Sequence, residues 1–455
     1  MPAITSDKKL KTPKASLREQ VAGPKSIALF EEEQKYIAPG LQSIALFSKL
    51  AMESGKGATL RDVDGQEYLD FVAGIGVASL GYGHPEYARV LGEQAAKTAV
   101  GSFTTAHRLN FVKTLASVTP KGMTRVQLYS SGAEGVEAAL RLAKSRTKKF
   151  EVVSFWGGFH GKTGGTLPLL ADTFKYGLGP LMPGLYSTPY PDSRRCPLGA
   201  TGEHDCGAHC LQFLREKLRR ETSNSLSAII MEPIQGTNGN VVPPAGFMAG
   251  VAALARENGA LFISDEMITG FGRTGDWFAC LHEGVTPDIM TVGKGMAGGF
   301  PVSGVIASTE IAESKPWANP SGSSSSYGGN PLASAACDVT LQTIIKEKLV
   351  ENAKRVGAAL LKRLQDMQQR QPILGAVRGR GLMIGVDLVN PKTGAPLDTA
   401  FCRELFEDCL KRGLMTMSYN PSLRINPPLV ISEGEALRGA DILEEGISAL
   451  QRRRF

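Results

Sequence analysis

The sequence of 455 residues predicts an α/β protein with a mostly parallel central sheet in a large domain, and a smaller α+β domain built from both chain ends. Two observations support the large domain: short apolar runs rich in β-forming residues, and longer stretches with helical spacing between them. Such alternation places ligands at the carboxyl ends of the strands. The runs are 152–155, 228–231, 261–263 and 289–292, and the helical stretches include 135–149 and 247–258.

The two chain ends follow a different pattern. Asp64-Gly65 is a hairpin-type turn between two short strand signals, and the region after residue 341 alternates predicted helices with one strand-like run at 374–388. We therefore divide the chain into three parts. Residues 1–70 form an N-terminal arm and part of the small domain, 71–340 form the large domain, and 341–455 form the rest of the small domain. Four lysines at 8, 9, 11 and 14 indicate a loosely attached arm.

Composition excludes several classes of protein. The net charge of +7 arises from 51 basic and 44 acidic residues without a long basic run, so we expect no nucleic-acid partner. Apolar stretches are too short to cross a bilayer, and 1–23 lacks the apolar centre of a secretory signal, so we expect no membrane partner and a cytoplasmic location.

The seven cysteines are scattered and odd in number, which favours reduced thiols. Cys196, Cys206 and Cys210 gather near His204 and His209. The first gap is long and no paired CxxC unit is present, so we interpret the segment as a plain loop and expect no metal site.

Three polar segments follow strand signals. Tyr129–Glu134 is a small turn that opens a helix, where free backbone N–H groups can bind a phosphate. Asp265 ends the 261–263 strand, and Lys294 stands between two glycines after the 289–292 strand. A phosphate cradle, a carboxylate and a lysine at one sheet edge are what pyridoxal 5'-phosphate (PLP) requires for its phosphate, its pyridine nitrogen and its aldehyde.

The chain resembles the class III (omega) aminotransferases of fold-type I from about Leu41 to Ser448. Several motifs carry the resemblance in combination: Ser130-Ser-Gly-Ala-Glu134, Phe159-His-Gly161, Glu232-Pro-Ile-Gln-Gly236, Asp265-Glu-Met-Ile-Thr-Gly-Phe-Gly-Arg-Thr-Gly275, Gly293-Lys-Gly295, Tyr327-Gly-Gly-Asn-Pro331 and Arg424-Ile-Asn-Pro-Pro428. The resemblance implies PLP as cofactor, with residues 71–340 as the PLP-binding domain, and transfer of an amino group from an amino acid or amine to a keto acid, pyruvate or 2-oxoglutarate.

The resemblance also implies the two catalytic residues. Lys294 matches the lysine that holds the cofactor as a Schiff base and moves the proton once it is released. Asp265 matches the partner of the pyridine nitrogen.

Other positions match the family's cofactor contacts. The turn at Ser131, Gly132 and Ala133 is expected to bind the phosphate, and Ser326 to reach the phosphate of the partner subunit in a homodimer. Phe159 and Met267 are expected to cover the two faces of the ring.

The remaining expected contacts lie around the ring and the substrate. His160 and Glu232 support the cofactor site by orienting its turn and the neighbours of Asp265. Arg424 is expected to receive substrate carboxylates, and Ile75 and Tyr327 to line the substrate pocket.

Some positions depart from the family pattern and leave alternatives open. Ile268 replaces a Gln that bonds the cofactor's phenolic oxygen in many members, and Thr237 replaces a Glu. A decarboxylating subgroup shares the small hydroxyl residue at Thr237 but carries a Gln where this chain has Ile75, which argues against decarboxylation. Racemisation or epimerisation of amino acids is not excluded by any residue. A PLP-binding regulator without turnover is disfavoured, because the cofactor residues are intact and no DNA-binding arm is present.

Overall fold

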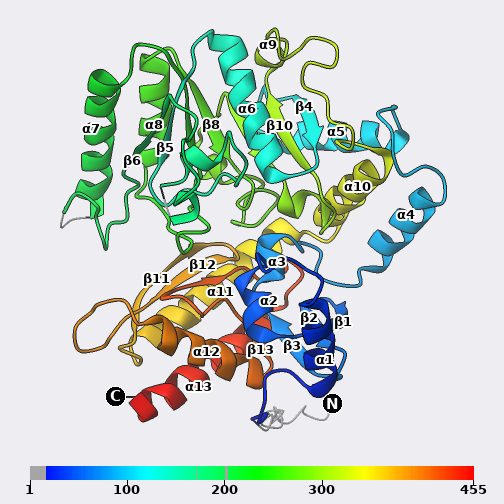
Figure 1. Cartoon of the computed structure of the whole chain (residues 1–455), viewed down its shortest axis with the longest axis vertical. Helices are drawn as coiled ribbons and strands as arrows, with labels where there is room; N and C mark the ends of the chain where they lie inside the picture. The colour runs from blue at the N-terminus through cyan, green and yellow to red at the C-terminus, as the bar shows by residue number, and fades with distance from the viewer. Residues whose placement is uncertain (1–16, 172, 200–202, 455) are drawn as a thin grey trace, which may run out of the picture.

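A computed structural model describes residues 17–171, 173–199 and 203–454. Figure 1 shows a large domain with a central sheet above a smaller domain that holds both described chain ends. The predicted lysine-rich arm at 8–14 and the side chain of His204 lie outside the described part of the structure. In the described part, no helix is long and apolar enough to cross a membrane.

The large domain is built on a seven-stranded sheet in the order β4-β10-β9-β8-β7-β5-β6. β10 pairs antiparallel with both of its neighbours, and the other pairings are parallel, as predicted. β7 is buried at every position, because parallel strands covered on both faces are apolar along their whole length. The strands are β4 (Arg125–Tyr129), β5 (Glu151–Phe155), β6 (Leu185–Thr188), β7 (Leu226–Met231), β8 (Leu261–Asp265), β9 (Ile289–Val292) and β10 (Ser303–Ala307).

Helices cover the sheet. The helices of this domain are α4 (Pro85–Ala95), α5 (Ala106–Val118), α6 (Gly132–Thr147), α7 (Glu203–Glu221), α8 (Phe247–Glu257), α9 (Thr309–Ala312) and α10 (Pro331–Lys346), with 3-10 turns η1 (Leu167–Leu169), η2 (Thr173–Lys175), η3 (Ala279–Glu283) and η4 (Lys294–Ala297). α6 begins immediately after β4 because of a capping box: Ser131 Oγ accepts from Glu134 N at 3.3 Å, and Glu134 Oε2 accepts from Ser130 N at 2.8 Å.

The small domain is formed by both chain ends, as predicted. β13 (Leu414–Met415) adds in parallel to the N-terminal strands β1 (Met52–Lys56), β2 (Thr59–Asp62) and β3 (Glu67–Asp70). The turn at Asp64-Gly65 joins β2 and β3, with Gly65 at φ 82°. The other elements are α1 (Pro24–Glu33), α2 (Ser43–Ser48), α3 (Ala73–Gly76), α11 (Leu349–Gln368), α12 (Thr399–Lys411), α13 (Glu433–Arg454) and the sheet of β11 (Leu374–Arg380), β12 (Met383–Leu388) and β14 (Ser422–Ile425).

The three-part division of the chain at 70 and 340 stays a prediction, and residue 340 falls inside α10. Buried polar contacts join the two domains. Arg273, from the loop after β8, donates to the carbonyls of Leu382 and Pro427. Asn240, after β7, donates to Asn426 Oδ1 at 2.9 Å. The end of the central sheet therefore faces the small domain.

The plain loop predicted around Cys196, Cys206 and Cys210 is wrong for two of the three. Cys206 and Cys210 lie in α7, and with Leu214 and Leu218 they form a fully buried stripe at a spacing of four residues. This helical spacing stabilises the segment through burial of one apolar face, despite the glycine, proline and histidine residues around it.

Candidate active site

The carboxyl ends of β4, β5, β7, β8 and β9 meet at one edge of the central sheet. Lys294 begins η4 directly after β9, with φ 44° between Gly293 and Gly295. Burial lowers the pKa of Lys294, although the carboxylates of Asp265 and Glu232 act in the opposite direction. No hydrogen bond or ion pair to the Lys294 amine occurs among the described residues. A buried amine with a lowered pKa is a better nucleophile than a solvated lysine.

Asp265 is a buried carboxylate with fixed orientation at the end of β8. His160 Nδ1 lies 2.6 Å from Asp265 Oδ2, while Thr291 Oγ1 and Met267 N donate to Oδ1 at 2.9 and 3.2 Å. Burial opposes the charged form of His160, but the hydrogen bond and charge of Asp265 raise the pKa of this histidine. The carboxylate is thus held rigidly by three groups.

Glu232, after β7, connects two loops of the site. Glu232 Oε1 accepts from Phe159 N at 2.8 Å, and Oε2 accepts from Gly236 N at 3.0 Å. Burial raises the pKa of Glu232, and its neighbours His160 and Asp265 act in opposite directions. The carboxylate therefore fixes the backbone of Phe159, and the orienting role of Glu232 stays a prediction.

The N-terminus of α6 packs tightly against the other loops of the site. A Cβ atom at Gly161 would lie 2.5 Å from Ala133 Cβ, so only glycine permits the turn after Phe159 to approach α6. Ser303 Oγ donates to the carbonyl of Ser131 at 2.6 Å. These contacts place the predicted phosphate turn beside the Phe159 turn.

Met267 lies between the α6 turn and the Lys294 turn. Its Sδ would be 3.5 Å from a Cβ at Gly132 and 2.7 Å from a Cβ at Gly293. The neighbouring Ile268 is buried with Ile234 and Met383, so no polar group stands at that position.

Arg424 approaches this edge from β14 of the small domain. Its Nη2 lies 3.5 Å from Met417 Sδ, and its side chain is also hydrogen-bonded to Tyr419. Burial lowers the pKa of Arg424, while Tyr419 and Glu232 raise it. Ile75 packs against the apolar cluster that contains Met417 and Tyr419, so these two predicted substrate residues lie in one region. Within the described chain, Arg424 has no carboxylate within ion-pair distance.

Tyr327 and Ser326 are not brought to this region by any described contact. Tyr327 is 65% exposed, and Ser326 is also exposed. Phe103 is 84% exposed, and Arg108 Nη1 links its loop to the Tyr327 loop by donating to the carbonyls of Ser102 and Gly329. Two aromatic side chains therefore stand in solvent on adjacent loops of the single chain.

Two positioning groups escaped prediction from sequence. Thr291 faces Asp265 because β8 and β9 pair in register at these residues. Arg378 of β11 lies in a bidentate pair with Asp387, at 2.8 and 2.9 Å, and Arg195 Nη2 lies 3.5 Å from the same aspartate. The hydroxyl three residues before Lys294 could have indicated Thr291, whereas no local signal marks the Arg378–Asp387 pair, which joins the neighbouring strands β11 and β12.

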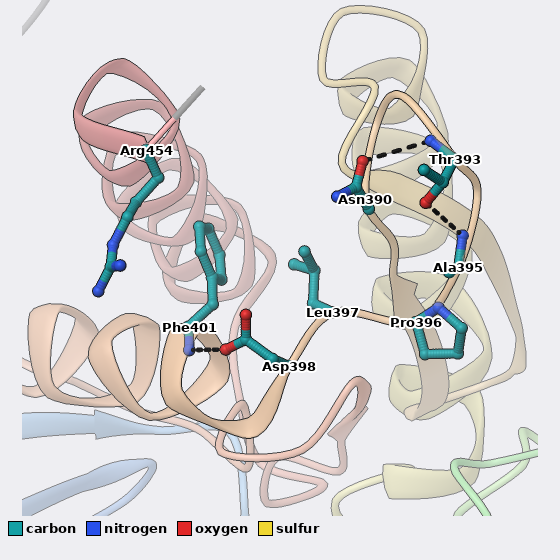
Figure 2. Close-up of a pocket in the computed structure, with 8 residues that line it drawn as sticks. All are labelled: Asn390, Thr393, Ala395, Pro396, Leu397, Asp398, Phe401 and Arg454. Atoms are coloured by element: carbon teal, nitrogen blue, oxygen red, sulfur yellow. Dashed lines mark hydrogen bonds between the residues drawn. The ribbon is translucent and has the colours of Figure 1, made fainter.

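A hollow of about 330 Å³ in the small domain is separate from this site (Figure 2). Its polar groups serve the local backbone: Asn390 Oδ1 accepts from Thr393 N, Thr393 Oγ1 accepts from Ala395 N, and Asp398 caps α12 by accepting from Phe401 N at 2.7 Å. We assign no ligand to it. No group of three metal-ligating side chains occurs among the residues that the structure describes.

The residues at the sheet edge fit PLP. Lys294 is an amine without an ion-pair partner among the described residues, Asp265 is a buried anion, and the α6 turn offers backbone donors at a helix N-terminus. When bound, PLP supplies an electron sink for the substrate's Cα–H bond. The protein residues would bind the phosphate, keep the ring nitrogen protonated and hold the ring between Phe159 and Met267.

Comparison with known proteins agrees with this geometry. The model of the "Aminotransferase class-III" family matches residues 43–447. The chain belongs to the class III aminotransferase family. It is therefore a PLP-dependent enzyme that transfers amino groups from a donor to a keto acid.

Three similar proteins illustrate the range of this family. An acetylornithine aminotransferase from Methanosarcina acetivorans is 35% identical over 92% of this chain and 96% of its own. An alanine/serine racemase from Pyrococcus horikoshii is 34% identical over 93% of this chain and 91% of its own. A PLP-bound amine transaminase from an uncultivated Pseudomonas species has a TM-score of 0.84 at 28% identity, covering 92% of this chain and 98% of its own.

Proposed function

We propose that this aminotransferase uses amino donors with an α-carboxylate and pyruvate or 2-oxoglutarate as acceptor. The observation that carries the proposal is Arg424, a partly buried guanidinium without a carboxylate partner in the described chain. A cation left without an anion in a buried site is costly, so a substrate carboxylate that binds there gains a charge-assisted hydrogen bond. Thr237 could bond but could not neutralise Arg424 when no carboxylate is bound.

The roles of the site residues are part of this proposal. Lys294 carries the cofactor covalently and, once released, moves the proton at the substrate's Cα. Asp265 keeps the ring nitrogen protonated, with His160 and Glu232 as positioning residues. This assignment is supported by the short His160–Asp265 contact and by the two backbone bonds of Glu232.

We propose a homodimer in which Ser326 reaches the phosphate at the partner's site. The exposed Phe103 and Tyr327 support this proposal, because large aromatic side chains in solvent are typical of interfaces. Light scattering coupled to size exclusion tests the assembly, and Tyr327→Arg should shift the mass toward that of one chain. A wild-type mass of one chain would contradict the proposal. The cytoplasmic location stays a prediction.

The donor preference can be tested with a panel of α-amino acids, ω-amino acids and simple amines, each against pyruvate and 2-oxoglutarate. We expect α-amino acids to give the highest kcat/KM. Equal use of simple amines would contradict the α-carboxylate proposal without affecting the family assignment.

Racemisation is the second candidate, because a relative at 34% identity is an alanine/serine racemase. The same panel separates the two reactions when the enantiomers of the residual donor are measured without any keto acid. Inversion of the donor at a rate equal to or above that of transfer would favour racemisation. Retention of chirality would favour transfer.

A further inference from the structure

A cluster of three cysteines, Cys196, Cys206 and Cys210, lies in the part of the chain between β6 and the first half of α7. Cys206 and Cys210 lie one turn apart on α7 and are fully buried, and the half-buried Cys196 on the loop packs against the same core. The thiol of Cys206 is hydrogen-bonded to both Cys196 and Cys210. None of the three takes part in the active site described above.

The other four cysteines have different surroundings. Cys280, Cys337, Cys402 and Cys409 are buried, and the groups that act on their thiols are carboxylates, backbone, the Arg412 guanidinium or the Thr416 hydroxyl rather than other thiols. Among the described residues, contact between thiols is therefore a property of the Cys196, Cys206 and Cys210 cluster.

The three thiols differ in reactivity. Burial raises the pKa of Cys206 and, to about 12, that of Cys210, which keeps both protonated. Cys196 is partly exposed, whereas Cys206 and Cys210 are fully buried. A dissolved oxidant therefore reaches the Cys196 thiol first.

We propose that Cys196 and Cys206 are a redox modification site that forms a reversible disulfide with hydrogen peroxide. The Cys196 sulfur attacks one oxygen of the peroxide and becomes a sulfenic acid. The other oxygen leaves as the first water molecule. Cys206 sulfur then displaces the hydroxyl group, and its thiol proton leaves with this group as the second water. Two thiols lose two electrons, and the peroxide is reduced to water.

Cys196 is the better partner for Cys206 than Cys210 is. The helix backbone fixes the positions of Cys206 and Cys210, one turn apart. A disulfide requires a specific geometry, and two positions fixed in this way cannot move to reach it. Cys196 lies on a loop that has fewer such constraints, between Asp192 and Gly199.

The disulfide would attach the loop that carries Cys196 to α7, and this loop also contacts the active-site region. Tyr190, on the same loop, donates to the carbonyl of Glu232 at 3.2 Å, and Arg195 lies 3.5 Å from Asp387 of the small domain. Because a cross-link restricts the unfolded chain, we expect oxidation to raise the Tm by about 2–4 °C.

The test uses the full-length holoenzyme, treated either with reductant or with hydrogen peroxide and then blocked with N-ethylmaleimide. Trypsin leaves all three cysteines on one peptide, 196–215, and further cleavage at Glu203 or Asp205 separates Cys196 from the other two. In the oxidised sample we expect the two fragments to remain joined until reductant is added. Fragments that separate without reductant would overturn the proposal.

Variants identify the partner. Cys210→Ser should keep the cross-link and the rise in Tm, whereas Cys206→Ser and Cys196→Ser should each lose both. Cys402→Ser, a buried thiol without thiol neighbours, is the matched control and should behave as wild type. A cross-link that survives in Cys206→Ser, or stoichiometric zinc in the purified reduced protein, would contradict the assignment of this pair.

Discussion

Arg378 and Arg424 stand in one row of the small-domain sheet, on either side of Gly385, yet their partners differ. Arg378 is paired in bidentate fashion with Asp387, whereas Arg424 contacts Met417 and Tyr419 and has no carboxylate partner in the described chain. The same contrast holds at the sheet edge, where, within the part of the chain that the structure describes, Asp265 has three hydrogen-bonding partners and the Lys294 amine has none. The paired groups fix the site, and the two unpaired cations remain available for cofactor and substrate.

The largest expected effect concerns the unpaired cation at the sheet edge. Lys294→Ala removes both the covalent link to PLP and the proton carrier, so we expect turnover to fall by at least about 10⁴-fold. PLP can remain bound through the phosphate and ring contacts. Kinetic assays with added PLP check this outcome, with Lys148→Ala on the far end of α6 as control. Near-normal turnover would show that Lys294 is not the reactive amine.

The paired arginine should affect stability instead of substrate binding. Arg378→Ala leaves Asp387 buried beside Arg195 and the Ser422 hydroxyl, and breaking such a pair costs about 3–5 kcal/mol of unfolding free energy. Denaturant unfolding measures this cost. If stability were unchanged but KM for the keto acid rose strongly, Arg378 would be a substrate residue and the comparison with Arg424 would fail.

Replacing the hydrogen-bonded carboxylate of Asp265 should lower the reaction rate more than it disturbs the fold. Asp265→Asn can keep bonds from Thr291 and His160 but loses the charge, so the ring nitrogen is no longer held protonated. We expect kcat to fall by about 10²–10³-fold, with little change in the circular dichroism spectrum. Kinetics close to those of wild type would exclude this role.

An acid introduced at position 237 should reduce the contrast between the two arginines. Gly239, two residues after Thr237, contacts Arg378 and Ser422 of the small-domain sheet. Thr237→Glu should compete for Arg424 and weaken α-amino acid donors by about two- to fivefold relative to ω-amino acid donors, the range of an exposed ion pair. Steady-state kinetics with both donor classes check this ratio, and Thr237→Gln controls for side-chain size.

The sequence was sufficient to predict features that depend only on which residues follow one another in the chain. Lys294 and Asp265 follow buried strands, so their place at one sheet edge could be predicted from strand ends alone. Thr291, Arg378 and Asp387 could not be found in this way, because their contacts depend on the register of neighbouring strands. The α7 start was missed because the cysteines and histidines of this segment were weighed only by metal-ligand spacing, whereas the spacing of buried residues determined a helix.

The most direct test of the account compares two acceptors in one variant. Arg424→Ala should raise KM for pyruvate by about 10- to 150-fold, the equivalent of 1.5–3 kcal/mol for a charge-assisted hydrogen bond, and should leave kcat/KM for a neutral ketone or aldehyde nearly unchanged. Arg378→Ala should show no such selectivity. If both acceptors lost the same factor in Arg424→Ala, Arg424 would not be the carboxylate anchor.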